Sequence, residues 1–110
     1  MHSDPRLVER VNAATRGWPG LAPKQMFGGM AWLLRGNMCV GIWHESLIVR
    51  CGPEKWASLL EKPHVREMDI TGRSMKGWLI VDPPALRTSA ALCAWLDRSR
   101  DFVATLPPKR

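Results

Sequence analysis

Near the start of the chain, apolar side chains recur at the spacing of one helix face. Between residues 7 and 14 they alternate with arginine and glutamate at intervals that fit a 3.6-residue period. Asp4 followed by Pro5 is typical of a helix start, because the aspartate accepts a hydrogen bond at the N-cap and proline suits the first helical position. The pattern predicts a helix from Pro5 to just before Gly17. An ordered loop over 18–23, with Trp18 and Leu21 folded back on the core, should follow.

The next apolar segments are shorter and read as strands. Residues 25–35, 38–44 and 47–51 are rich in apolar and β-branched side chains and are separated by two-residue breaks at Gly36-Asn37 and Glu45-Ser46. Glycine at the first central position suits a type II′ hairpin turn. Such short connections join antiparallel neighbours. The sequence therefore predicts a three-stranded antiparallel meander.

The second half of the chain alternates between helix and strand signals. Gly52-Pro53 breaks the sheet and opens a second helix, which Pro63 ends. Residues 65–70 predict a weak strand. Residues 77–81 are apolar on both faces and predict an interior strand. Thr88 or Ser89 caps a last helix that ends before Pro107.

This order, helix, three strands, helix, two strands and helix, predicts an α+β domain. Its sheet should be mainly antiparallel and five-stranded, in a two-layer architecture. With 110 residues, the chain has the size of one domain, 1–110.

The two-residue turns fix which side chains share a face of the meander. The expected register puts Arg35 opposite Met38 and His44 opposite Leu47. One face then holds small aliphatic side chains, on which helices can pack. The other face is apolar too, which is unusual for an exposed antiparallel face. Its larger side chains form a candidate interface for a protein partner or a homodimer: Met30, Trp32, Trp43, Ile48 and Arg50. The alternative is that the last helix covers this face and packs Trp95 against Trp43.

Composition narrows the class of protein. Hydrophobic residues make up 45% of the chain and charged residues 24%, as in globular domains. No apolar run approaches the length of a membrane helix, and the N-terminus lacks the apolar core of a signal peptide. We therefore expect a cytoplasmic protein with no membrane partner.

The net charge of +6 makes nucleic acid a candidate partner. The basic residues are scattered, however, and no helix-turn-helix or basic stripe is present. We expect nucleic acid to bind weakly if at all, with solvated surface as the main role of these charges.

Motifs for catalysis, cofactors and metals are missing from the sequence. Cys39, Cys51 and Cys93 lack metal-ligand spacing, and their odd number argues against a disulfide framework, so we expect free thiols. By the expected register, Cys39 and Cys51 lie on opposite faces of the sheet. Ser46 beside His44 has no third group in view. Gly28-Gly29 lies within a strand pattern and predicts a bulge or bend. No catalytic, cofactor-binding or metal residue is therefore assigned, and a non-enzymatic role is expected.

Four residues, Met26, Phe27, Gly28 and Gly29, open the first strand as an M-F-G-G signature. The Gly36-Asn37 turn, the two strands after it and a second block over 71–78 follow in an order that resembles the N-terminal domain of the TfoX/Sxy competence regulators. The resemblance covers about 4–106. It implies a secretion-chaperone-like α+β fold and no catalytic residues. The family's full-length regulators act in natural competence with a cyclic-AMP receptor protein at promoters and carry a C-terminal domain, so a stand-alone N-terminal domain is expected here.

Three functions remain open from the sequence. The first is a small non-enzymatic protein of the TfoX N-terminal type that acts by protein–protein contact in transcription or competence regulation. The second is a direct nucleic-acid binder using an Arg-rich surface, whose affinity would fall steeply with salt. The third is an enzyme or small-ligand carrier with a pocket near Gly28-Gly29.

Overall fold

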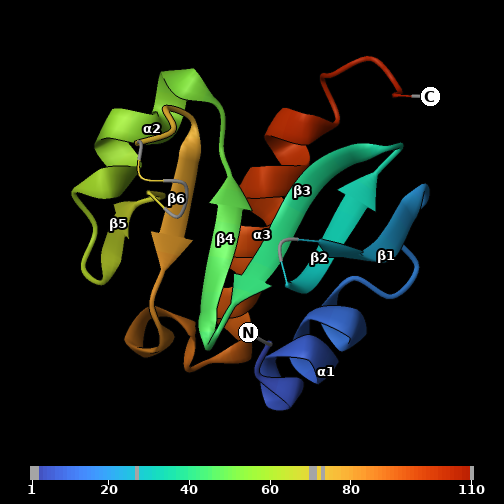
Figure 1. Ribbon diagram of the computed structural model, residues 1–110, viewed down its shortest axis with the longest axis horizontal. Helices are drawn as coiled ribbons and strands as arrows, with labels where there is room; N and C mark the ends of the chain where they lie inside the picture. The colour runs from blue at the N-terminus through green and yellow to red at the C-terminus, as the bar shows by residue number, and fades with distance from the viewer. Residues whose placement is uncertain (1–2, 27, 70–71, 73, 110) are drawn as a thin grey trace.

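The computed structural model describes residues 3–26, 28–69, 72 and 74–109 and has an α+β fold, as predicted (Figure 1). The strands form an antiparallel sheet in the order β1-β2-β3-β4-β6-β5. It has six strands where five were expected. The elements are α1 (Pro5–Ala14), β1 (Leu21–Met26), β2 (Gly29–Leu34), β3 (Asn37–Trp43), β4 (Ser46–Arg50), α2 (Pro53–Leu60), β5 (Val65–Glu67), β6 (Trp78–Val81), the 3-10 helix η1 (Pro83–Leu86) and α3 (Ser89–Val103).

Helix α1 begins and ends close to the predicted positions. The Asp4 side chain accepts a hydrogen bond from the backbone N–H of Arg6 at 3.1 Å, which satisfies one of the free donors of the first turn. Leu7 and Val11 are buried on the inner face of the helix. The helical periodicity of the sequence therefore identified both the element and its buried side.

The sixth strand arises because the expected strand over 25–35 is two strands with a chain reversal between them. The loop expected over 18–23 accordingly gives way to β1, which pairs with β2. Gly28 has φ +76°, and a Cβ on Gly29 would lie 2.6 Å from the carbonyl oxygen of Ile42. The two glycines of the M-F-G-G signature thus serve a turn and a close backbone approach, while Phe27 lies outside the described residues.

Strand β1 forms one edge of the sheet. The backbone N–H of Arg35 donates to Gly20 at 2.8 Å, so even-numbered residues of β1 point their backbone groups toward β2 and odd-numbered ones point outward. Pro23 occupies an outward position and has no N–H to offer. This edge is therefore a poor template for the addition of another strand.

The turn of the first hairpin lies one residue earlier than expected, which shifts the pairing next to it by two residues. Leu34 pairs with Asn37, so Arg35 and Gly36 form the two-residue turn in place of Gly36-Asn37. Both have positive φ, 49° and 85°, as a type I′ turn requires. A non-glycine residue with positive φ is uncommon, which explains why the sequence favoured the wrong pair.

A bulge further along the hairpin changes which side chains of β2 and β3 share a face of the sheet. Trp32 pairs with Val40 but Leu33 pairs with Met38, so Cys39 is the extra residue. Cys39, Val40 and Trp32 consequently all belong to the main core. The expected placement of Cys39 and Cys51 on opposite faces is therefore wrong, because Cys51 lies in this core too.

The β3–β4 pairing also differs from the expectation, but without consequence for the faces. Ile42 pairs with Leu47 and Val40 with Val49, which is a shift of two residues. Because side chains alternate with a period of two, a shift of two keeps every side chain on its expected face. The aliphatic set Val40, Ile42, Leu47 and Val49 forms the inner surface, as predicted.

The second half of the chain follows the predicted order. Strand β5 is shorter than the expected 65–70, and Ile70 lies outside the described residues. Strand β6 lies between β4 and β5 and is interior to the sheet, as its apolar sequence predicted. The Thr88 side chain caps α3 by accepting from the N–H of Ala91 at 3.0 Å.

The helices contribute to a single core on one side of the sheet. Helix α3 crosses β3 and β4, and the ribbon shows it behind them in Figure 1. The indole N–H of Trp32 donates to the Asn12 side chain of α1 at 2.9 Å, which connects β2 to that helix. A second, smaller cluster on the other side contains no helical residue.

Candidate interaction surface

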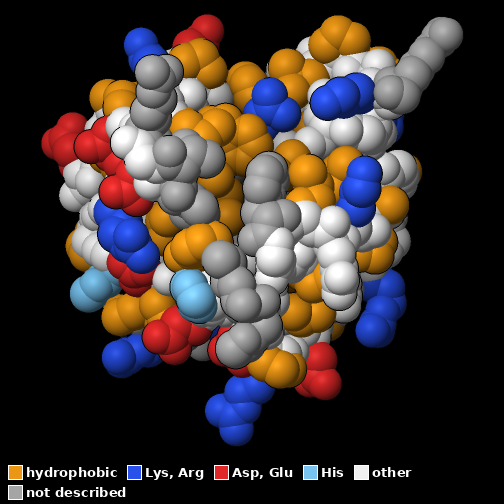
Figure 2. All heavy atoms as spheres, in the orientation of Figure 1, with side chains coloured by type: hydrophobic (Ala, Val, Ile, Leu, Met, Phe, Trp, Pro, Cys, Tyr) orange, Lys and Arg blue, Asp and Glu red, His pale blue; other side chains and the backbone are white. Residues whose placement is uncertain are grey.

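The sheet face without helices is apolar. Three of its side chains are buried, with exposed fractions of 5% or less, and four are partly exposed. We call this set the open face: Ile48, Met68, Ile80, Met38, Trp43, Met75 and Trp78. Figure 2 shows hydrophobic side chains gathered in the upper central part of this view, over β4 and β6. An antiparallel sheet usually presents a polar face to water, so the composition of this face needs an explanation.

Strand β3 shapes the middle of the open face through a glycine. A Cβ on Gly41 would lie 2.8 Å from the terminal methyl of Met38 and 3.7 Å from Ile48. The missing side chain thus leaves a depression that the flexible Met38 fills. Such a site can repack around an incoming side chain at low cost.

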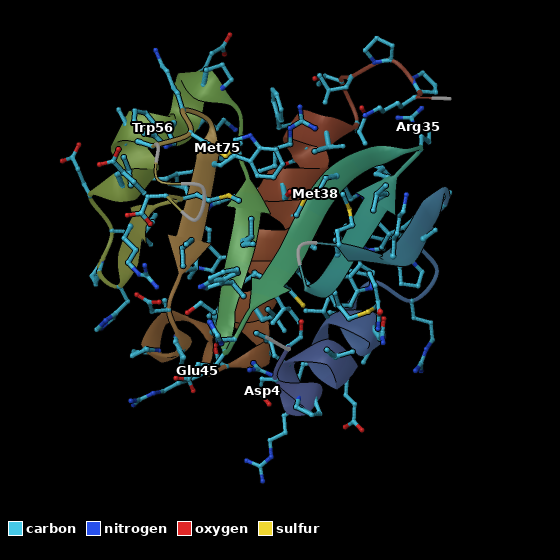
Figure 3. All side chains as sticks on the ribbon, viewed as in Figure 1. Asp4, Arg35, Met38, Glu45, Trp56 and Met75 are labelled. Atoms are coloured by element: carbon cyan, nitrogen blue, oxygen red, sulfur yellow. The ribbon has the colours of Figure 1, made fainter. Side chains whose placement is uncertain are left out.

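The loop before β6 brings a second methionine over the sheet. The N–H of Met75 donates to the carbonyl of Met68 at 3.1 Å, and the N–H of Trp78 donates to Met75 at 3.1 Å. Figure 3 labels Met38 on β3 and Met75 in this loop, both over the upper half of the sheet. Three methionines therefore surround Ile48 and Ile80, and methionine-rich surfaces adapt to partners of varied shape.

Arg50 lies at the end of β4, on the same side of the strand as Ile48. Its guanidinium carbon is 5.0 Å from the ring centre of Trp78 and 5.8 Å from that of Phe102. Its Nη1 donates to the carbonyl of Met38 at 3.4 Å. Burial lowers the pKa of Arg50, but an arginine with these contacts stays charged at neutral pH.

The structure brings together only part of the predicted interface. Trp43, Ile48 and Arg50 lie on the open face. Trp32 is only 1% exposed within the main core, and Met30 packs against the same core. Their inclusion in one shared surface is wrong, because the bulge at Cys39 reverses the facing of β2 relative to β3.

The alternative arrangement is wrong as well. Trp95 of α3 belongs to the main core, whereas Trp43 belongs to the open face, so the last helix does not cover Trp43. The predicted interface did not include Met38, Met68 and Met75, or the two β6 side chains Trp78 and Ile80. The alternation of Trp78 and Ile80, which stand opposite Arg50 and Ile48, carried a usable signal for β6.

The residues weighed as nucleophiles have structural partners. The Ser46 hydroxyl donates to Asp82 Oδ1 at 2.7 Å, and Arg66 binds the same carboxylate through Nε at 2.9 Å. Burial raises the pKa of both Cys39 and Cys51, which keeps these thiols protonated and unreactive. The three cysteines are free thiols. Among the described residues, no three His, Cys, Asp or Glu side chains gather as metal ligands would.

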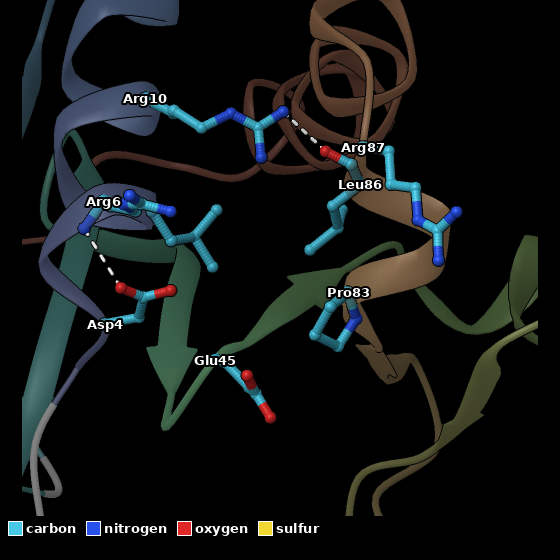
Figure 4. A pocket seen from close by; sticks show the side chains of 8 residues that line it. Asp4, Arg6, Arg10, Glu45, Pro83, Leu86 and Arg87 are labelled. Carbon is cyan, nitrogen blue, oxygen red and sulfur yellow. Dashed lines mark hydrogen bonds between the residues drawn. The ribbon is translucent and has the colours of Figure 1, made fainter.

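A charged pocket of about 310 Å³ lies between α1 and η1 (Figure 4). Asp4 and Arg6 border it on one side and Arg87 on the other, and Arg10 donates from α1 to the carbonyl of Leu86. Its lining mixes three arginines with two carboxylates and does not include Gly28 or Gly29. The pocket therefore does not match the ligand site considered at those glycines.

None of the helices among the described residues has both the length and the apolar character needed to cross a bilayer. The architecture is that of an α+β domain whose helices lie on one side of an antiparallel sheet and whose other side is an apolar, methionine-rich surface. The family model of the TfoX N-terminal domain matches residues 13–103. The chain belongs to this family. No match was found among curated proteins or solved structures.

Proposed function

We propose that this chain is a non-enzymatic regulatory domain that acts by binding another protein through the open face. Membership of the TfoX N-terminal domain family supports a regulatory role linked to competence. The observation that carries the proposal is the apolar character of a sheet face that no helix of the described chain covers. Trp43, Trp78, Met38 and Met75 are partly exposed there and belong to residue types enriched in protein interfaces.

The proposal can be tested by site-specific photocrosslinking in the native cell. A photoreactive amino acid replaces Met38 or Met75 on the open face, or Asp97, which is exposed on α3, as the matched control. We expect the probes at the Met38 and Met75 positions to capture the same protein, and the Asp97 probe not to capture it. Equal capture from Asp97, or no adduct from either face position, contradicts the proposal.

A further inference from the structure

The Arg50 guanidinium lies between Trp78 of the open face and Phe102 of helix α3, which packs against the main core. The half-buried guanidinium donates one N–H to the Met38 carbonyl. A guanidinium has five N–H donors in a planar fork that fits a carboxylate. The position therefore combines partial desolvation with donors that find no further acceptor among the described residues.

No carboxylate of the described chain neutralises this charge. All ten Asp and Glu side chains lie within the described residues, and the ion pair found among them joins Arg66 to Asp82. A partly buried cation is stabilised by an opposite charge, and its interaction strengthens when a partner excludes water. The open face thus offers a fixed point for a negative group beside an apolar surface.

The net charge indicates where that negative group comes from. A second copy of this chain would bring the same +6 charge to the contact and, in a two-fold arrangement, the same unpaired Arg50. A partner with acidic residues meets no such repulsion. Charge complementarity therefore favours a different protein over a homodimer.

We propose that the open face binds a partner segment that combines bulky apolar side chains with one carboxylate, which pairs with Arg50. This inference rests on the proposed function and specifies its partner. The apolar side chains pack against Met38, Met75 and Trp43, which adapt to different sequences. The carboxylate fixes the orientation of the segment through the planar guanidinium.

The test uses a random peptide display library selected on the full chain. The most enriched acidic peptide and its twin, with Gln for Glu or Asn for Asp, are then titrated by fluorescence polarisation. We expect the amide twin to bind the wild type at least about ten-fold more weakly. Arg50→Met should weaken the acidic peptide to a similar extent and leave the twin unchanged.

Arg98→Met is the matched control, because Arg98 also stacks on a tryptophan, Trp95, at 4.4 Å, but on the helical side. It should leave both affinities unchanged. Enriched peptides without a carboxylate, or equal affinities of the acidic peptide and its twin for the wild type, overturn the inference. The comparison of the acidic peptide with its twin uses only the wild-type protein, so it does not depend on the folding of any variant.

The two proposals fail differently. Met38→Glu and Met75→Glu should abolish binding of any selected peptide if the open face is the site. Peptides that lose binding in these variants but need no carboxylate contradict only the role of Arg50. A library that yields no peptide sensitive to either variant contradicts the proposed function itself.

Discussion

Single residues decide where this chain can turn and how closely its strands approach. Gly28 permits the reversal between β1 and β2 through its positive φ, and Gly29 lets the backbone of β2 lie against Ile42 and Ser3. The Ser3 hydroxyl, which accepts from the N–H of Met30 at 2.8 Å, is part of that contact. The paired glycines of the family signature are therefore explained by packing rather than by ligand binding.

Gly29→Ala should destabilise the fold by about 1–3 kcal/mol, because the added methyl would lie 2.6 Å from a backbone oxygen that cannot move alone. Chemical denaturation measures the free energy of unfolding. Gln25→Ala, on the exposed edge strand, is the control and should change it by less than about 0.5 kcal/mol. An equal effect of the two changes would refute the close approach.

The ion pair of Asp82 should make stability depend on acid pH. The hydrogen bond from Arg66 is the main cause that lowers the pKa of Asp82, and the Ser46 hydroxyl contributes as well. A lowered folded-state pKa means that the stabilisation is complete above the usual aspartate pKa and is lost as pH falls through the folded value.

Asp82→Asn should therefore cost up to about 1 kcal/mol at pH 7, a modest value because Arg66 is half exposed. The difference from wild type should shrink below about pH 4. Urea denaturation across this range checks the trend. Ser46→Ala keeps the charge pair, so its difference in stability from wild type should change less with pH than that of Asp82→Asn. If the two differences change with pH in the same way, the ion pair is not the cause.

At the scale of elements, local patterns predicted the existence and type of most helices and strands. The cap at Asp4, the breaks at Gly52-Pro53 and the apolar run of β6 each specify structure within a few residues. The register of the first hairpin was not predictable in the same way, because Arg35 adopts a positive φ only in the folded context. The surrounding structure stabilises it, since the Arg35 carbonyl accepts from Lys109 at 2.8 Å.

Only part of the open face was predictable from the sequence. The turns predict which face of the sheet each side chain occupies. That prediction stays correct when the pairing shifts by two residues, as at β3–β4, but fails where a bulge adds one residue, as at Cys39. Trp43 and Ile48 were therefore placed correctly, and Trp32 was not. The contribution of Met68 and Met75 depends on a long-range pairing of β5 and β6 with the meander, which no local pattern encodes.

The segment after α3 packs against the first hairpin and should depend on Gly36. A Cβ there would clash with the carbonyl oxygen of Lys109, and Gly36 also has φ +85°. Gly36→Ala should lower stability by at least about 1 kcal/mol and speed hydrogen exchange at the Lys109 amide. Asn37→Ala removes only the 2.8 Å hydrogen bond to Pro107 and should have a smaller effect. Unchanged exchange at Lys109 in Gly36→Ala would contradict this contact.

At the scale of the whole molecule, the net charge is +6, and several of the described arginines make intramolecular contacts. Arg98 and Arg100 stack on Trp95 and Trp18 at 4.4 and 4.8 Å, and Arg66 pairs with Asp82. These intramolecular contacts reduce the number of arginines that are free to follow a phosphate backbone.

We therefore expect DNA binding to be weak and non-specific. In electrophoretic mobility shift at physiological salt, any complex should disappear when competitor DNA is added, and affinity should fall as salt rises because counterions drive the association. A complex that survives competitor would favour the nucleic-acid function instead.

The central claim is that the two apolar faces of the sheet differ in role, one being core and the other a contact surface. Trp32→Glu and Trp43→Glu test it as a pair, with a thermal melt and the photocrosslinking yield from the Met75 position measured for each variant. Trp32→Glu should unfold the protein, because it buries a charge without a partner. Trp43→Glu should remain folded and lose the crosslinked partner. A Trp43→Glu variant that unfolds like Trp32→Glu, or that keeps its crosslink, would contradict the account.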